Sequence, residues 1–462
     1  MEIAVIILAA GQSKRILSKT PKVLHPLCGK PLLAYPLAVA KALKARVTAV
    51  VVPPGENRRG ANPIADYVTA QPGLQKVVQK TPLGTGHAVA ATIQSLKKFS
   101  GHVLILSGDV PLLHADVVKA FVSEVVRKKS KLGLMTTKVP DPQGYGRIVR
   151  DLSGNISAII EEKEASPDVR TITEINPAIY CVEKRWLFEA LTKLKRHPVN
   201  GEYYLTDIVG LAVGRGENVF GVLVEDYRQC LGINTRAELA EAQELMRKKI
   251  VDRWLAQGVG FINPDDTYID ADVVIGADTL IYPNVCLRGV TKVGSDCVLD
   301  IGSVISDSIL ADGVHIKPYS VIESARVGTG AQVGPFARLR PEAVLKEQVR
   351  VGNFVEVKKS VLEKGVKANH LSYIGDARVG RETNIGCGTI TCNYDGFKKY
   401  RTVIGDKVFV GSDVQFVAPV RVGRGAVIGA GSTITKNVPE YALALSRSLQ
   451  VNKKGWARKR KK

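Results

Sequence analysis

The chain has 462 residues, of which 45% are hydrophobic and 24% are charged, and this composition is typical of a soluble globular protein. The length exceeds what one hydrophobic core organises and predicts two or three domains. No segment approaches the roughly 18 consecutive apolar residues of a membrane span. The apolar N-terminal run lacks the basic segment that opens a signal peptide. We therefore expect a cytoplasmic protein without a membrane partner.

The formal net charge of +21 indicates anionic partners. Nucleic acid is one such class and small polyphosphates are another. Aromatic residues are only 6% of the chain, and we find no aromatic-rich basic motif of the RNA-binding type. Seven of the residues 453–462 are Lys or Arg, a pattern typical of a solvated tail. The seven cysteines include no Cys-x-x-Cys pair, which argues against disulfides and zinc. Anionic small molecules, and not nucleic acid, are the expected partners.

Residues 1–235 alternate apolar strands with helical stretches. The strands are continuous apolar runs without strict alternation, at Ile3–Ala9, Val47–Val52, His102–Leu106 and Gly133–Thr137. Strands that helices cover on both faces have this pattern, which predicts a Rossmann-like α/β domain with a parallel sheet. Ligands bind such sheets beyond the carboxyl ends of the strands. Gly11 and Asp109 both follow a strand end and mark the place where chemistry is expected.

Residues 236–257 are predicted to form one helix that connects two domains. Thr235 and Glu238 have the spacing of a capping box. Apolar residues then recur at helical steps as far as Trp254, and Gly258 ends the helix.

Residues 258–462 form a second predicted domain with a period of six. Three series of apolar residues keep this spacing: 269 to 305, 327 to 357 and 404 to 434. A hexapeptide repeat has this period, because each short strand points one aliphatic side chain into a triangular coil. The expected fold is an all-β left-handed parallel β-helix. Lys364–Tyr373 and Thr391–Arg401 interrupt the spacing and are expected to be loops that carry function.

Three segments of the first domain carry groups suited to phosphate chemistry. Leu8-Ala9-Ala10-Gly11 leads from a strand into a basic turn with Arg15 and Lys22. A second glycine-bearing loop extends from Gln79 through Gly84-Thr85 and allows a nucleobase to approach the backbone closely. Asp109 follows the third strand and is the kind of ligand that Mg²⁺ uses.

With the further segments Gly144–Val149, Glu174–Asn176 and Gly201–Asp207, the first half resembles the sugar-nucleotide pyrophosphorylases. The whole chain resembles the family of bifunctional bacterial enzymes that combine glucosamine-1-phosphate N-acetyltransferase and N-acetylglucosamine-1-phosphate uridylyltransferase activities. The resemblance implies that acetyl-CoA acetylates glucosamine 1-phosphate, and that the product attacks the α-phosphorus of UTP and releases pyrophosphate. It also implies a role in supplying peptidoglycan and lipopolysaccharide precursors.

The resemblance assigns residues to the uridylyltransferase site. Asp109 and Asn234 would hold Mg²⁺, while Lys22 and Arg15 would contact phosphate. The attacking oxygen is already anionic, so alignment and charge neutralisation suffice and no general base is needed. The nucleotide and sugar would be bound by Leu8, Ala9, Ala10, Gly11, Gln79, Gly84, Thr85, Gly146, Glu161 and Asn176. Gly11-Gln12-Ser13-Lys14 stands where the family usually has Gly-x-Gly-Thr, so this loop departs from the pattern at Ser13.

Segments of the second half match the acetyltransferase domain of the same family: Pro335–Pro341, Val351–Lys359, His370–Asp376 and Asn384–Gly396. Acetyl transfer to an amine needs a base, and His370 has suitable chemistry near neutral pH. By resemblance Arg340 and Lys358 bind the sugar phosphate, and Tyr373 and Asn384 position the hexosamine. Acetyl-CoA would contact Cys387, Asn393, Tyr394, Ser412, Ala430 and Arg447. Cys387 replaces the usual Ala, and we interpret it as a small lining residue and not a nucleophile.

Alternatives remain at this point: a pyrophosphorylase whose β-helix is only regulatory or oligomerising, a non-enzymatic subunit of a translation-factor exchange complex, and a nucleic-acid binder. The family resemblance and the retained site residues favour the bifunctional enzyme. We also expect a homotrimer, because loops on one triangular prism cannot alone enclose coenzyme A.

Overall fold

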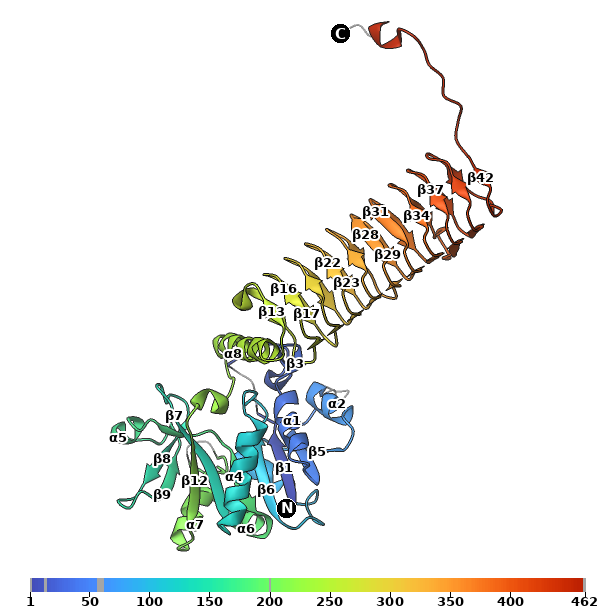
Figure 1. Cartoon of the computed structure of the whole chain (residues 1–462). Coiled ribbons are helices and arrows are strands. Elements are labelled where there is room, and N and C mark those ends of the chain that lie inside the picture. The colour runs from blue at the N-terminus through green and yellow to red at the C-terminus, as the bar shows by residue number, and fades with distance from the viewer. Residues whose placement is uncertain (1, 12–14, 56–61, 199–200, 460–462) are drawn as a thin grey trace. The chain divides into compact units, whose positions relative to one another are not determined.

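The computed structural model describes residues 2–11, 15–55, 62–198 and 201–459, which divide into two compact units, Met1–Met246 and Arg247–Lys462 (Figure 1). The departure at Ser13 lies outside the described residues. None of the helices in the described part of the chain combines the length and apolar character that a membrane crossing requires.

The first unit is built on a ten-stranded sheet in the order β5-β4-β1-β6-β11-β7-β10-β8-β9, with β12 also pairing with β7. Its strands are β1 Ile3–Leu8, β4 Val47–Val52, β5 Leu74–Val78, β6 His102–Ser107, β7 Leu132–Lys138, β8 Gly146–Arg150, β9 Ile156–Ile160, β10 Glu174–Asn176, β11 Tyr180–Glu183 and β12 Val219–Val224. A small hairpin joins β2 Pro26–Leu27 and β3 Lys30–Pro31. The four predicted strands are β1, β4, β6 and β7. These four strands run parallel to one another, as expected, but the sheet as a whole is mixed, because β11 lies between β6 and β7 and runs antiparallel to both.

Two cores cover the two faces of this sheet. Alternate residues of β1 belong to opposite cores: Ile3, Val5 and Ile7 to one, Ala4 and Ile6 to the other. Both sets are buried because helices lie on both faces, and this explains why the strand is apolar throughout. The first core includes residues of α1 Ala34–Ala42, α2 Pro63–Thr69 and α4 Ala115–Arg127, and the second includes residues of α3 Thr85–Ala90, α6 Lys184–Leu191 and α7 Asp207–Gly214. The short α5 spans Pro167–Arg170.

The helix predicted over residues 236–257 is α8, Arg236–Leu255. Its capping box is present: the Glu238 amide donates to the Thr235 hydroxyl at 3.1 Å, and the Thr235 amide donates to the Glu238 carboxylate at 3.0 Å. The boundary between the two compact units falls inside this helix, between Met246 and Arg247.

The second unit is a left-handed parallel β-helix in which each strand pairs with the strand three further along the chain, except at the end, where β40 pairs with β42 (Figure 1). One sheet contains β13 Gly260–Phe261, β16 Leu280–Ile281, β19 Val298–Leu299, β22 His315–Ile316, β25 Gln332–Val333, β28 Arg350–Asn353, β31 Lys367–His370, β34 Asn384–Ile385, β37 Phe409–Val410, β40 Val427–Ile428 and β42 Leu443–Ala444. The next contains β14 Tyr268–Ile269, β17 Cys286–Arg288, β20 Val304–Ser306, β23 Val321–Glu323, β26 Arg338–Leu339, β29 Glu356–Lys358, β32 Tyr373–Gly375, β35 Ile390–Cys392, β38 Gln415–Val417 and β41 Thr433–Ile434. The third contains β15 Val274–Ile275, β18 Lys292–Val293, β21 Ile309–Leu310, β24 Arg326–Val327, β27 Val344–Leu345, β30 Val361–Leu362, β33 Ala377–Val379, β36 Thr402–Ile404 and β39 Val420–Val422.

The expected loop at Lys364–Tyr373 is wrong, whereas the one at Thr391–Arg401 contains a real insertion. In the first stretch β31 continues the coil and Ala368 occupies a buried inward position, as Ile374 does directly after the stretch. The second stretch lies between β33 and β36, where Ala377 pairs with Thr402, 25 positions later, instead of the 18 between Thr402 and Val420. The coil therefore continues through the first stretch, where the small residue Ala368 points inward. Only the second stretch contains a loop that projects from the coil.

Phe416 is the largest of the fully buried side chains in the β-helix, and we expect its removal to destabilise this unit strongly. Phe416→Ala should cost about 3–5 kcal/mol, because the surrounding coil cannot collapse into the space left by the ring. The matched control is Phe409→Ala on the neighbouring strand β37, where the ring is 54% exposed. Calorimetry of the full chain should show a much larger downward shift of the β-helix transition for Phe416→Ala; equal shifts would contradict this packing.

Candidate active sites

The carboxyl ends of β1, β4 and β6 meet at one edge of the first sheet. The Ala9 amide donates to the Val51 carbonyl and the Gly108 amide donates to the Leu8 carbonyl, both at 2.9 Å. The predicted residues Leu8, Ala9 and Asp109 are therefore neighbours at this edge, as parallel strands require. Ala10 is buried and Gly11 is exposed, with open space around its Cα.

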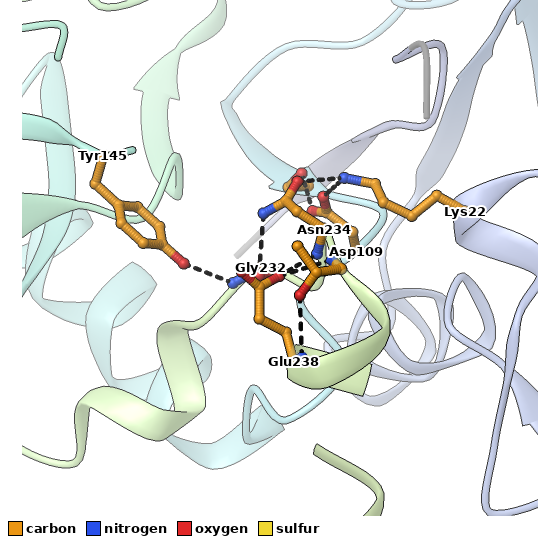
Figure 2. Close-up of polar contacts among 8 residues, drawn as sticks. Lys22, Asp109, Tyr145, Gly232, Asn234 and Glu238 are labelled. Atoms are coloured by element: carbon orange, nitrogen blue, oxygen red, sulfur yellow. Dashed lines mark hydrogen bonds and ion pairs between the residues drawn. The ribbon is translucent and has the colours of Figure 1, made fainter. Parts of the chain in front are cut away.

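Lys22, Asp109 and Asn234 converge at this edge although they are far apart in the chain. Lys22 Nζ forms an ion pair with the Asp109 carboxylate and donates to Asn234 Oδ1 at 2.9 Å. The hydroxyl of Ser107 donates to the other carboxylate oxygen of Asp109 at 2.6 Å. Figure 2 shows the amine of Lys22 reaching both oxygen groups. Sequence reasoning missed Ser107, although it precedes Asp109 by only two residues.

The loop that carries Asn234 is held on both sides. The Ile233 amide donates to the Asp109 carbonyl at 3.0 Å, and the Gly232 amide donates to the hydroxyl of Tyr145 at 3.2 Å (Figure 2). Burial raises the pKa of Tyr145, so the phenol stays neutral near pH 7. Arg15 lies on the same side of the site, because a Cβ on Gly144 would be 3.9 Å from its guanidinium. Tyr145 belongs to a segment matched by resemblance, but sequence reasoning gave it no role.

The oxygen groups of Asp109 and Asn234 are suited to a hard divalent cation. Both already accept from the single ammonium of Lys22, so they point toward one position. Mg²⁺ prefers oxygen ligands and usually takes only one or two from protein side chains. Within the described ranges no group of three or more His, Cys, Asp and Glu side chains is suited to hold a metal ion. The donor set therefore fits a cation that shares its coordination with substrate phosphates and water.

The glycine-bearing loop of the predicted nucleotide site is tied to a distant segment. Gln79 is buried and donates to the Gly84 carbonyl at 3.1 Å. Gly84 has a φ of 94°, and a Cβ there would lie 2.6 Å from the Tyr203 carbonyl oxygen, so no other residue fits without strain. The hydroxyl of Thr85 accepts from the Leu205 amide at 3.0 Å. The three predicted residues therefore shape one rigid loop.

The three predicted sugar residues lie close to one another beside β8 and β10. Asn176 pairs with Gly146 across the two strands, and a Cβ on Gly146 would lie 3.6 Å from the Glu161 carboxylate. Thr206 donates to Glu161 at 3.1 Å. Burial, followed by the neighbouring carboxylates, raises the pKa of Glu161 despite that hydrogen bond. Asn176 is buried and donates to the Tyr180 hydroxyl at 2.7 Å.

In the second unit, His370 lies at the end of β31 and is exposed. Its Nδ1 lies 3.1 Å from the amide oxygen of Asn353 on the paired strand β28. Because an amide oxygen only accepts, a neutral ring in this contact would carry its proton on Nδ1 and its lone pair on Nε2. Tyr373 begins the next strand and its hydroxyl lies over Gly375, where a Cβ would be only 2.4 Å away. Asn384 lies on β34, which pairs with β31.

A cluster of cations faces this region. Arg340 donates to Glu356 at 2.8 Å, and this contact raises the pKa of Arg340. Contact with the Lys399 amine, and repulsion from its charge, lower the pKa of Lys358. Lys399 was not predicted from the sequence. The signal was available, because Lys398-Lys399 stands inside the stretch identified as a loop.

The predicted acetyl-CoA residues lie on successive coils and on the inserted loop. The Asp413 amide, next to Ser412, donates to the Cys387 carbonyl at 2.7 Å, and Arg447 donates to the Ala430 carbonyl at 2.8 Å. In the loop, Asn393 donates to Asp376 at 2.5 Å and Tyr394 forms a bridge with Lys399. Tyr394 is 60% exposed. The loop is thus a short hairpin whose aromatic side chain is available to a ligand.

Comparisons with known proteins match segments of both units to known families. Residues 5–201 match the family described as MobA-like NTP transferase domain, residues 263–352 match the GMPPB C-terminal domain, and residues 401–436 match the bacterial transferase hexapeptide, six repeats. The "Bifunctional protein GlmU" of Trichlorobacter lovleyi is 46% identical over 99% of this chain and 98% of its own length. The protein of the same name from Geotalea uraniireducens is 46% identical over 99% of this chain and 99% of its own length. The one from Listeria monocytogenes is 42% identical over 98% of this chain and 97% of its own length.

The fold and the two clusters define an enzyme that joins a nucleotidyltransferase domain to a hexapeptide-repeat acyltransferase domain. The identity over nearly the whole length places the chain more narrowly: it belongs to the family of the bifunctional proteins GlmU. Membership gives no support to the alternatives of a purely structural β-helix or a non-enzymatic exchange subunit.

The opposite environments of Glu161 and Glu162 generate a prediction about stability. The raised pKa of Glu161 means that its ionisation opposes folding increasingly as the pH rises from the acid range to neutrality. A hydrogen bond from the buried Arg147 lowers the pKa of Glu162, whose contribution is present at neutral pH and lost as the pH falls through its folded-state value. At pH 7, Glu161→Gln should raise the melting temperature of the first unit by on the order of 2 °C, and Glu162→Gln should lower it at least as much.

Calorimetry of both variants at pH 7 and pH 4 checks this. The gain from Glu161→Gln should disappear at pH 4, where the wild-type side chain is protonated. A loss of stability in Glu161→Gln at pH 7 would contradict the burial argument.

Proposed function

We propose that the chain synthesises UDP-N-acetylglucosamine in two steps. The second unit transfers the acetyl group of acetyl-CoA to glucosamine 1-phosphate, and the first unit transfers the uridylyl group of UTP to the resulting N-acetylglucosamine 1-phosphate. The observation that carries this proposal is the coexistence, in one chain of this family, of the Lys22–Asp109–Asn234 cluster and the His370–Tyr373 cluster with its three cations. We assign residues 1–235 to the first activity, 236–257 to a helical linker and 258–462 to the second.

The uridylyltransferase site works by positioning and charge. The loop of Gln79, Gly84 and Thr85 would hold uracil, and Gly146, Glu161 and Asn176 would orient the sugar. Lys22 and Arg15 would bind the phosphates of UTP. The attacking phosphate oxygen is anionic, so the chain needs to align it with the α-phosphorus and stabilise the charge that moves to pyrophosphate.

Asp109 and Asn234 would hold Mg²⁺ in this site. A bound Mg²⁺ neutralises phosphate charge that builds up on the leaving pyrophosphate. With Asp109 and Asn234 holding a cation, Lys22 would be released from its ion pair with Asp109 and could contact the nucleotide. The contact of Lys22 with both oxygen donors supports this exchange of one cation for another.

In the acetyltransferase site, His370 is the proposed general base. The amine nitrogen of glucosamine 1-phosphate attacks the thioester carbonyl carbon, its proton passes to Nε2 of His370, and the coenzyme A thiolate leaves. The contact between Nδ1 and Asn353 supports the tautomer that this step requires. Arg340, Lys358 and Lys399 would bind the sugar phosphate, while Tyr373 and Asn384 would position the hexosamine.

We further propose that the chain is cytoplasmic and forms a homotrimer. All seven cysteines are free thiols, as a reducing compartment favours. Tyr319, Phe336 and Phe354 form an exposed stacked ridge on successive coils, with ring centroids 5.4 and 5.5 Å apart. An exposed apolar ridge of this kind favours contact with another protein surface, and a second copy placed there would help to enclose acetyl-CoA.

Reciprocal variants test the two activities separately. Asp109→Ala should reduce pyrophosphate release by roughly 100-fold or more, because charge stabilisation worth several kcal/mol is lost, and should leave coenzyme A release unchanged. His370→Ala should reduce acetyl transfer by about 100-fold or more and leave uridylyl transfer to supplied N-acetylglucosamine 1-phosphate unchanged. Asp116→Ala on α4 and His315→Ala on β22, a strand of the same sheet as His370, are the controls. Uridylyl transfer at the wild-type rate in Asp109→Ala would exclude its assigned role.

Deletion of residues 446–462 tests the contribution of the tail and of assembly. Arg447 contacts Ala430, and the tail is strongly basic, so its loss should lower acetyl transfer selectively by raising the KM for acetyl-CoA. Uridylyl transfer should not change, because all residues assigned to that site are in the first unit. Light scattering on the full chain should give a trimer. A monomer that acetylates at full rate would overturn the proposed assembly.

A further inference from the structure

The imidazole ring of His197 is held between two carboxylates in the first unit. Its Nδ1 lies 2.7 Å from Glu164 Oε1, and its Nε2 lies 2.9 Å from Asp207 Oδ2. The ring also packs on Tyr204, with centroids 4.1 Å apart and planes inclined by 32°. The His197 side chain is only 19% exposed. None of the functions assigned above uses this residue.

Both contacts are satisfied only by an imidazolium. A neutral ring has one N–H, so its other nitrogen would turn a lone pair toward a carboxylate. Burial alone would lower the pKa of His197, but the hydrogen bonds and charges of Asp207 and Glu164 outweigh it and raise the pKa above the ordinary value. The titratable groups around the ring are Glu164 and Glu161 after β9, Asp207 at the start of α7, and Tyr204, on which the ring packs.

Glu164 and Asp207 belong to two segments that position Glu161, one of the residues proposed to bind the sugar. The Glu164 amide donates to the Glu161 carbonyl at 2.9 Å. Asp207 directly follows Thr206, whose hydroxyl donates to the Glu161 carboxylate. The His197 charge also acts on Glu161, lowering the pKa that burial raises. The His197 ring thus links the two segments that lie on either side of Glu161, the carboxylate proposed to orient the sugar.

The segment from Glu202 to Thr206 also contacts the glycine-bearing loop that is proposed to hold the nucleotide. The Tyr203 amide donates to the Leu83 carbonyl and the Gly86 amide donates to the Tyr203 carbonyl, both at 2.8 Å. The Leu205 amide donates to the Thr85 hydroxyl. A displacement of this segment would therefore move both Glu161, which is proposed to orient the sugar, and the loop of Gly84 and Thr85, which is proposed to hold the nucleotide.

We propose that His197 is a positioning residue of the uridylyltransferase site, which ties the turn Glu161–Glu164 to the segment Glu202–Asp207 and thereby fixes the sugar pocket. This inference rests on the proposed function of the first unit. His197 does not touch the reacting atoms; it acts through Glu164 and Asp207. At a pH below the ordinary pKa of histidine, the ring of His197 is cationic and holds both carboxylates. This link is lost as the pH rises through the raised pKa of His197 in the folded protein.

Steady-state kinetics of the full chain test the proposal. With saturating UTP and Mg²⁺, the KM for N-acetylglucosamine 1-phosphate in the wild type should rise with pH between 6.5 and 9, while kcat stays within about twofold. His197→Gln should raise that KM by about 10-fold at pH 7 and abolish its pH dependence, because Gln has no charge and carries both of its N–H donors on one nitrogen, so its oxygen would face the second carboxylate. His197→Arg keeps a permanent cation with several donors and should restore a low KM that no longer depends on pH.

His102→Gln is the matched control, since His102 is at the opposite end of β6 from Ser107 and, among the described residues, its ring has a hydrogen-bond contact only with the Ser130 carbonyl, at 3.4 Å. Its kinetics should match the wild type. Nitrogen NMR of ¹⁵N-histidine-labelled protein, assigned with the His197→Gln variant, should show an imidazolium at pH 7. A neutral ring at pH 7, or a wild-type KM and pH profile in His197→Gln, would overturn the proposal. A wild-type chain that releases no pyrophosphate would instead contradict the proposed function.

Discussion

Parallel strand pairing is the constraint on which both proposed active sites depend. In the first unit, β1, β4 and β6 run in the same direction, so the segments that follow them emerge at one edge. Lys22, Asp109 and Asn234 can meet there although 212 positions separate the first from the last. In the second unit, each coil stacks on the previous one, so equivalent turns form columns along the prism. The arrangement of backbone hydrogen bonds therefore decides which side chains become neighbours.

The two sites solve different electrostatic problems with different residue types. Uridylyl transfer brings together anionic groups, and the first site accordingly contains cations and oxygen groups suited to a divalent cation. Acetyl transfer needs an unprotonated amine, and the second site contains an exposed histidine whose Nδ1 lies beside the amide oxygen of Asn353. Its cations, Arg340, Lys358 and Lys399, suit a phosphate that does not react. Repulsion within this cluster, visible in the lowered pKa of Lys358, is energy that a bound phosphate would relieve.

Much of the fold follows from sequence periodicity, because periodicity reports burial. Apolar runs located β1 and β4 within a residue of their bounds, and the six-residue series located the coils. The antiparallel strand β11 was missed, because Tyr180–Glu183 is too short to stand out as a run. The supposed loop at Lys364–Tyr373 has the opposite cause. Ala368 faces inward where larger aliphatic residues were sought, so a filled position looked like a gap.

The candidate site residues were predicted by resemblance, whereas their partners were not. Resemblance identifies positions shared by a family, and it says nothing about contacts between segments that only folding brings together. Ser107, Tyr145 and Lys399 were missed for this reason, and so was the position of His197 between two carboxylates. Tyr145 lies in a segment that the resemblance matched and Lys399 in the stretch identified as a loop, but the sequence did not show what either side chain contacts. What distinguishes them is the chemistry of the atoms that the fold places next to them.

The shapes of the two units imply different requirements for completing a site. At the sheet edge of the first unit, loops from several strands surround the Lys22–Asp109–Asn234 cluster, and Asp109 is only 14% exposed. The β-helix is a convex prism, so its columns of residues face outward, and His370 and Tyr394 are both exposed. A convex surface cannot exclude water from a thioester by itself. A neighbouring surface must supply the remaining walls, and this geometric need is the physical reason to expect assembly for acetyl transfer alone.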